Sequence, residues 1–201
     1  MKALLRKDFY VITTTFKTIM IVWLVFPIVA IINPGVSFFI LYIGLIAGTM
    51  SSTLISYEER EKWPLFAGTL PISRKQIITE RYLFTLLMIL LATAMGAVIL
   101  AINSVRGYPA SPALLVQIFS TSLIMPTFLL PLTYKYGVEK SRYIVMIIVI
   151  GFSIGSQEIL SVFENEKISS FILPAMIIGS LALFAVSYLL SLKWYSEKEF
   201  H

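Results

Sequence analysis

Cysteine is absent from this chain of 201 residues, and aspartate and histidine occur once each, as Asp8 and as His201 at the last position. The lack of cysteine excludes disulfides and thiolate metal sites. With a single aspartate and a single histidine, the chain has no histidine-based zinc site, no Ser-His-Asp triad and no paired aspartates within a membrane. The sequence also lacks a GxxxxGK[ST] phosphate loop. We therefore expect a chain that is not an enzyme and binds no metal or cofactor of its own.

Charge is scarce as well, because only 13% of the residues are charged while 58% are hydrophobic, and the mean hydropathy is +0.87. Soluble domains carry about 25% charged residues, so this balance indicates a membrane protein. Six apolar stretches have the roughly 17–25 residues that a membrane helix needs. The stretches are 18–34, 36–56, 82–103, 113–134, 143–160 and 171–191. The predicted fold is all-α, with six transmembrane helices in a single domain over residues 1–201.

The basic residues predict the orientation of this domain. All but two of the 16 lysines and arginines fall before the first predicted span, in the even-numbered loops or in the tail. The exceptions are Arg106 and Lys167. Because basic loops remain in the cytoplasm, we expect both termini and the charged segment 57–82 to be cytoplasmic.

The segment 1–17 is amphipathic. Leu5, Phe9, Ile12 and Phe16 recur at helical spacing and form one apolar face. Such a helix is expected to lie in the headgroup layer at the cytoplasmic surface. Two interpretations remain open: a simple surface anchor, or an elbow that also contacts a cytoplasmic partner.

Glycines four residues apart occur in two predicted spans. Gly44 and Gly48 lie in the second span, and Gly151 and Gly155 lie in the fifth. This spacing lets two helices approach closely, either within one chain or at a dimer interface. The fifth span loses its apolar character after Ile154, and Gln157 and Glu158 follow. Glu158 lies either in the outer headgroup layer or at membrane depth, where carboxylates are candidates for function.

The charged segment 57–82 interrupts the apolar chain. Glu58 and Lys62 are spaced as a helical ion pair, which predicts that the second span continues into the cytoplasm. Pro64 is expected to end that helix at Trp63 and to begin a short helix with its exit at Gly68. Ser73 and Gln76 then have the S-x-x-Q spacing of a capping box, which predicts the start of the next helix.

The short helix has an apolar centre. Leu65, Phe66 and Leu70 are surrounded by charged residues, a composition typical of a protein-docking patch. The other interpretation is an interfacial loop whose Trp63 and Phe66 only insert into lipid.

This pattern of a Glu-rich segment, a short apolar helix and "LPISRKQI" between the second and third spans resembles the type-2 ATP-binding-cassette (ABC) exporter permeases. It is most similar to a small bacterial subfamily with separate ATPase subunits, which includes staphylococcal peptide-toxin exporter permeases. The resemblance implies a multi-pass protein of the bacterial plasma membrane with a cytoplasmic coupling segment at 57–81 and a coupling helix at about 64–70. The ATPase-coupling residues would be Glu58, Glu59, Trp63, Leu65, Phe66, Leu70, Pro71, Ser73, Arg74 and Lys75.

The resemblance also implies the assembly. Two permease chains, as a homodimer or a related heterodimer, would bind two copies of an ABC ATPase subunit, which would hold ATP and Mg. In similar permeases the first and fifth spans meet at the dimer interface, which would give Gly151 and Gly155 a role. Short outer helices after the fifth span would make Gln157 and Glu158 candidates for an outer gate or pathway.

The expected function is thus the permease subunit of an ATP-driven exporter. The few charges within the spans favour an amphipathic or hydrophobic cargo, such as a peptide, lipid or drug. Export as the direction rests on the resemblance. The alternative is a membrane scaffold or immunity-type protein that binds a cytoplasmic partner without transport.

Overall fold

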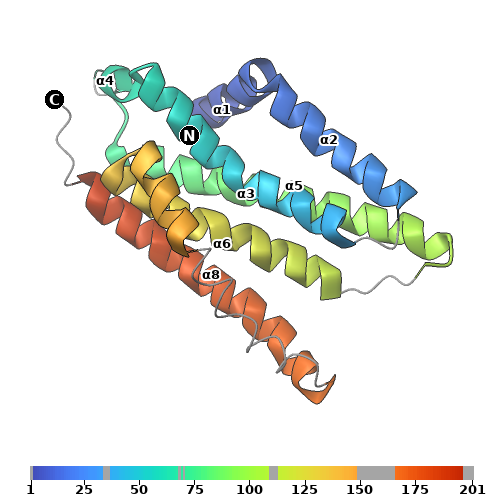
Figure 1. Ribbon diagram of the computed structural model, residues 1–201. Helices are drawn as coiled ribbons and strands as arrows, with labels where there is room; N and C mark the ends of the chain where they lie inside the picture. The colour runs from blue at the N-terminus through green and yellow to red at the C-terminus, as the bar shows by residue number, and fades with distance from the viewer. Residues whose placement is uncertain are drawn as a thin grey trace.

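The computed structural model describes residues 2–33, 37–67, 69, 71–108, 113–148 and 166–196, and the regular structure in these ranges is entirely helical (Figure 1). Residues 138–148 form a further helical segment. The main helices are α1 (Lys2–Thr15), α2 (Lys17–Ile32), α3 (Ser37–Arg60), α4 (Trp63–Ala67), α5 (Arg74–Val105), α6 (Ala113–Tyr136) and α8 (Glu166–Ser196). An all-α membrane fold was predicted, and the described elements agree with it.

Within the described ranges, four helices are long and apolar enough to cross a membrane. They cover Phe39–Arg60, Arg74–Val105, Ala113–Tyr136 and Pro174–Ser196, and overlap the second, third, fourth and sixth predicted spans. A fifth span results if α1 and α2 are taken together. The predicted fifth span, 143–160, lies largely outside the described residues, so the six-span topology remains a prediction.

The first two helices meet at a sharp bend of 84°. Phe16 lies at the break and has non-helical backbone angles, φ −104° and ψ 38°. Just before it, the hydroxyls of Thr13 and Thr14 donate to the carbonyls of Phe9 and Tyr10, at 2.9 and 2.6 Å. Such hydroxyl bonds to the preceding turn bend helices, and here they precede the point where the chain turns from α1 into α2.

The buried face of α1 differs from the apolar face predicted from the sequence. Leu4, Asp8 and Ile12 are buried against the other helices, whereas Phe9 is 45% exposed. Leu5 is half-buried beside this face. The prediction placed the apolar residues together and missed that the chain's single aspartate belongs to the buried side. Whether α1 lies in the headgroup layer remains a prediction.

The centre of the bundle depends on a close approach between α3 and α6. A Cβ added at Gly44 would overlap Ser122 Oγ, and one added at Gly48 would overlap the backbone oxygen of Ser122. On the other side of α3, Trp23 Nε1 donates to the carbonyl of Ile43 at 3.0 Å and joins α2 to it. Packing within one chain is thus confirmed for this glycine pair.

Polar side chains fasten α8 to α5. The Tyr82 hydroxyl lies 2.7 Å from the hydroxyls of both Ser187 and Ser191. The hydroxyls of Thr79 and Tyr188 lie 2.8 Å apart, one turn nearer the beginning of α5. These contacts hold the C-terminal helix beside the first half of α5.

A substitution at the backbone contact between α3 and α6 tests this packing. Gly48→Ala is expected to destabilise the purified protein by about 1–3 kcal/mol, because the new methyl group meets backbone that cannot rotate away. Gly179→Ala is the matched control, since nothing lies within 4 Å of a Cβ at that position in α8. Thermal unfolding in detergent measures both. Equal melting temperatures for the two variants would contradict the α3–α6 contact.

Candidate functional site

The charged segment folds as a short helix between two long ones. α3 ends at Arg60, and Lys62 takes a left-handed conformation with φ 54°, so the helical pair predicted between Glu58 and Lys62 does not form. The short helix α4 begins at Trp63, one residue before the predicted start, and ends at Ala67. The predicted short helix is therefore confirmed, with a different beginning and end.

The start of α5 was predicted correctly. Ser73 has an extended backbone, its Oγ accepts from the Gln76 backbone N–H at 3.2 Å, and Gln76 Oε1 accepts from the Ser73 N–H at 3.0 Å. This reciprocal pair is the capping box that the S-x-x-Q spacing indicates. α5 therefore begins at Arg74, which sets where the connection from α4 to α5 ends.

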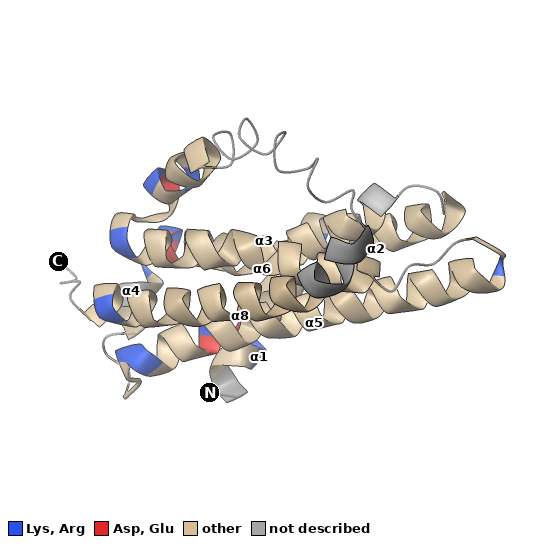
Figure 2. Cartoon of the chain, turned by 90° about the horizontal axis from the view of Figure 1, so that it is seen from below, with Lys and Arg blue, Asp and Glu red and all other residues tan. Residues whose placement is uncertain are grey.

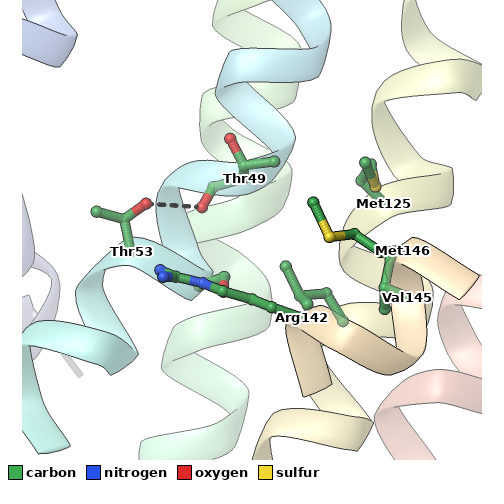
Figure 3. A pocket seen from close by; sticks show the side chains of 8 residues that line it. Thr49, Thr53, Met125, Arg142, Val145 and Met146 are labelled. Atoms are coloured by element: carbon green, nitrogen blue, oxygen red, sulfur yellow. Dashed lines mark hydrogen bonds between the residues drawn. The ribbon is translucent and has the colours of Figure 1, made fainter. Parts of the chain in front are cut away.

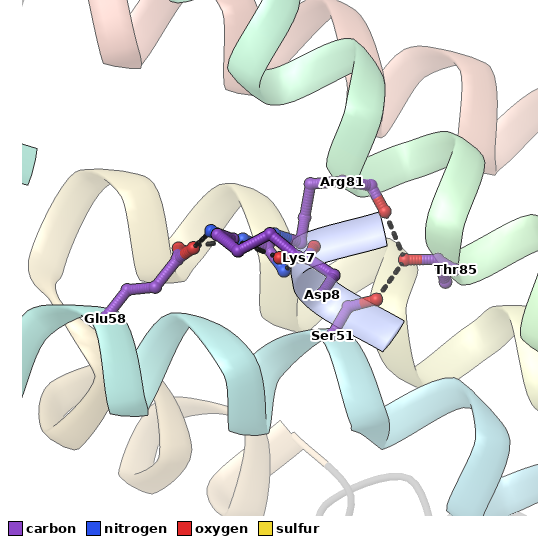
Figure 4. Close-up of polar contacts among 6 residues, drawn as sticks. All are labelled: Lys7, Asp8, Ser51, Glu58, Arg81 and Thr85. Carbon is purple, nitrogen blue, oxygen red and sulfur yellow. Dashed lines mark hydrogen bonds and ion pairs between the residues drawn. The ribbon is translucent and has the colours of Figure 1, made fainter. Parts of the chain in front are cut away.

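A buried arginine joins three helices behind α4 (Figure 4). Arg81 of α5 is 1% exposed; its Nη1 donates to Asp8 Oδ2 of α1 at 2.5 Å and its Nη2 donates to Glu58 Oε2 of α3 at 2.7 Å. Two charge-assisted bonds to separate carboxylates offset much of the cost of removing the guanidinium from water. We call Lys7, Asp8, Glu58 and Arg81 the ionic cluster.

Lys7 connects the ionic cluster to α4. Its ammonium group forms ion pairs with Asp8, at 3.1 Å, and with Glu58. The same nitrogen lies 4.2 Å from the centre of the Trp63 ring, a cation–π contact with the first residue of α4. α1 therefore contacts both the charged end of α3 and the short helix.

Hydroxyl groups extend this contact between α3 and α5 along the bundle. Ser51 Oγ and Thr85 Oγ1 lie 2.5 Å apart, and Thr85 also donates to the carbonyl of Arg81 at 2.8 Å (Figure 4). All three residues are buried. The two helices that flank α4 are thus joined by side-chain contacts from the ionic cluster to the next turn.

The predicted coupling residues divide into two groups. Phe66, Pro71 and Lys75 are exposed, and Phe66 exposes 56% of its surface beside the Trp63 ring, whose centre lies 5.4 Å away. The side chain of Leu65 and all of Leu70 lie outside the described residues.

The second group makes internal contacts. Glu58 belongs to the ionic cluster, Glu59 Oε2 accepts from the Val138 N–H at 3.3 Å, and Arg74 donates to the carbonyl of Ser196 at 2.8 Å. A role for these residues at an ATPase surface remains a prediction. Gly151, Gly155, Gln157 and Glu158 lie outside the described residues. In the described ranges, no group of three or more histidine, cysteine or acidic residues is arranged to hold a metal ion.

The ionic cluster was not predicted from the sequence. A signal was present: Asp8 is the only aspartate, and it lies in a helix whose other buried positions are apolar. Arg81 lies 73 residues away in the chain, so no local pattern connects the two.

Removal of the buried cation tests the ionic cluster. Arg81→Gln is expected to destabilise the protein by about 3–5 kcal/mol, because Asp8 and Glu58 lose the fully buried member of their two shared cations and keep only Lys7. Lys75→Gln removes one positive charge from an exposed position on the same helix and serves as the control. Chemical or thermal unfolding in detergent compares them. A similar small change in both would mean that the cluster does not hold these helices together.

Comparison with known proteins agrees with this architecture. Residues 3–196 match the family described as ABC-2 family transporter protein, which is nearly the whole chain. No curated protein and no solved structure matches the chain significantly. The ABC-2 family forms the membrane permease component of ABC transporters, which act with an ABC ATPase. The chain is therefore a multi-pass membrane protein that belongs to the ABC-2 transporter family.

Proposed function

We propose that this chain is the permease subunit of an ATP-driven exporter and that it couples to a separate ATPase subunit through residues 57–81. The observation that carries the proposal is α4, a short helix with an exposed Phe66, which the ionic cluster connects to the long helices. ATP and Mg would bind to the partner, two copies of which would serve two permease chains.

The surface of α4 supports docking to a protein. Phe66 is exposed next to a half-buried Trp63, and Glu61 and Lys62 are exposed just before them. An aromatic centre with a charged rim is typical of protein interfaces. Insertion of Phe66 into lipid would bring these flanking charges toward the apolar layer, which is unfavourable.

The contacts behind α4 provide a route for the ATPase to move the spans. α3 leads into α4, and α5, which has 32 residues and a length of about 48 Å, leads away from it. Because Arg81 and Lys7 hold α1, α3 and α5 together, a displacement of α4 is transmitted to all three helices as one body.

The distribution of charge supports a cytoplasmic position for α4. Figure 2 shows most of the lysines and arginines at the end of the bundle that carries α4, with few at the opposite end. By the positive-inside rule, this end faces the cytoplasm, where an ATPase subunit can reach it. In a bacterium the membrane would be the plasma membrane.

The interior of the bundle supports an amphipathic or hydrophobic cargo. Among the described residues, the buried charged side chains are Asp8, Glu80 and Arg81, all near the ionic cluster. The rest of the described interior is apolar or weakly polar and so offers no charged site for a strongly ionic cargo. A peptide, lipid or drug that carries apolar surface fits this lining.

The coupling proposal is tested at Phe66. Phe66→Glu is expected to weaken binding of the ATPase subunit by about 2 kcal/mol or more, roughly thirtyfold, because a charge replaces an interface anchor. Membrane insertion and melting temperature should not change, since the side chain is exposed. Co-purification and cargo-stimulated ATP turnover are the measurements.

Tyr108→Glu, at an aromatic residue that is 43% exposed beyond the far end of α5, is the control and should bind the ATPase normally. If both variants retain full binding and stimulated turnover, α4 is not the coupling element. Binding without any cargo-stimulated turnover in the parent protein would favour the scaffold alternative.

Assembly as a dimer is tested at Gly155. Gly155→Leu should shift the purified permease toward the monomer if the fifth span forms the dimer interface, because the larger side chain keeps the helices apart. Gly179→Leu is the control for added bulk on a membrane helix. The mass of the purified protein in detergent shows whether it is a monomer or a dimer. A dimer that persists with Gly155→Leu excludes this face.

A further inference from the structure

An apolar cavity of about 460 Å³ lies between α3, α6 and the helical segment 138–148 (Figure 3). Cavities of roughly 300–1,000 Å³ hold small ligands, so this one accommodates part of a flexible chain but not a folded peptide. The lining residues are Thr49, Ser52, Thr53, Met125, Leu129, Arg142, Val145 and Met146.

Arg142 is the only charged residue that lines the cavity in the described part of the chain. Figure 3 shows its side chain reaching from the segment 138–148 toward Thr53 of α3. Among the described residues, no carboxylate lines the cavity and Arg142 forms no ion pair, unlike Arg81. Because Arg142 is exposed and has no ion-pair partner among the described residues, it can bind an anionic group of a ligand beside the apolar cavity.

Ser52 provides a second, independent indication. It is 4% exposed, and its Oγ has no hydrogen-bond partner in the part of the chain that the structure describes. The neighbouring hydroxyls are occupied, because Thr49 donates to the carbonyl of Ile46 and Thr53 donates to the carbonyl of Thr49. A buried polar atom without a partner costs about 1–3 kcal/mol, so a polar ligand group that the Ser52 hydroxyl reaches by rotation about its Cα–Cβ bond would stabilise this wall of the cavity.

A polar hollow of about 380 Å³ follows the cavity along the seam where α3 faces the segment 138–148. Ser56, one turn beyond Ser52 on α3, lies in its wall. Glu59, Arg60, Glu139 and Lys140 also line this hollow. The seam between α3 and the segment 138–148 is thus apolar on one side of Arg142 and charged on the other, toward the end that carries α4. A membrane phospholipid has the same order of acyl chain, ester groups and charged head.

We infer that this cavity binds one anionic phospholipid of the cytoplasmic leaflet. An acyl chain lies between Met125, Leu129 and Met146, and the phosphate binds the guanidinium of Arg142. The Ser52 hydroxyl, which neighbouring atoms cover in this structure, turns toward the lipid and donates to an ester carbonyl. The cavity and the hollow together are lined by three basic side chains and two carboxylates, and this excess of positive charge favours the phosphate of such a lipid. The site is separate from α4, and lipid binding there does not require the ATPase subunit.

Lipid binding is measured by native mass spectrometry of the delipidated full-length chain. Palmitoyl-oleoyl phosphatidylglycerol should bind the parent chain and raise its melting temperature, and phosphatidylcholine with the same acyl chains should bind more weakly. Arg142→Gln should weaken binding of phosphatidylglycerol by about five- to tenfold. Lys17→Gln removes one charge from an exposed position on α2 and should bind like the parent chain.

A second variant tests the apolar part. Thr53→Phe places a ring in the cavity and should weaken both lipids while Arg142 is retained. If Arg142→Gln and Lys17→Gln weaken phosphatidylglycerol binding equally, the effect comes from general surface charge and the proposed site is wrong. Binding that is unchanged by both cavity variants would also overturn it. If Arg142→Gln instead dissociates a dimer that carries no bound lipid, a second copy of the chain covers the cavity and the lipid site is wrong.

Discussion

The buried guanidinium of Arg81 is the constraint on which the charged end of this bundle depends. A cation that is 1% exposed needs anionic partners at hydrogen-bond distance, and Asp8 and Glu58 provide them from two other helices. The need for these partners packs α1 against α3 and α5, so that α1 and α2 do not form one straight helix. The 84° bend and the buried face of α1 are therefore parts of one arrangement, as is the contact of Lys7 with Trp63.

Features that depend on local sequence alone were predictable. Long apolar runs indicated the helices that became α3, α5, α6 and α8, and the spacing of Ser73 and Gln76 indicated the start of α5. Gly48 indicated a close helix contact, although its partner on α6 was not specified. In each case the physical requirement is met within one helix or by its immediate neighbour.

Features that depend on distant partners were not predictable. The spacing of Glu58 and Lys62 favours a helical ion pair, but α3 ends at Arg60 and Glu58 instead pairs with a buried arginine 23 residues away. A buried charge pair has a larger energetic consequence than a solvent-exposed pair on one helix. The predicted docking patch had the same limit: composition identified its charges, while tertiary contacts pair Glu58, Glu59 and Arg74 with other parts of the chain and leave Phe66 at an exposed position, without such a partner in the described ranges.

The separation of Asp8 from Arg81 has a consequence for biosynthesis. The chain between them is 73 residues long, and ribosomes add about 5–20 residues per second, so α1 waits roughly 4–15 s for its cation. During that time Asp8 cannot enter an apolar environment at low cost and must stay hydrated. The first helix to be synthesised therefore docks only after the start of α5 has been made, later than its place in the chain suggests.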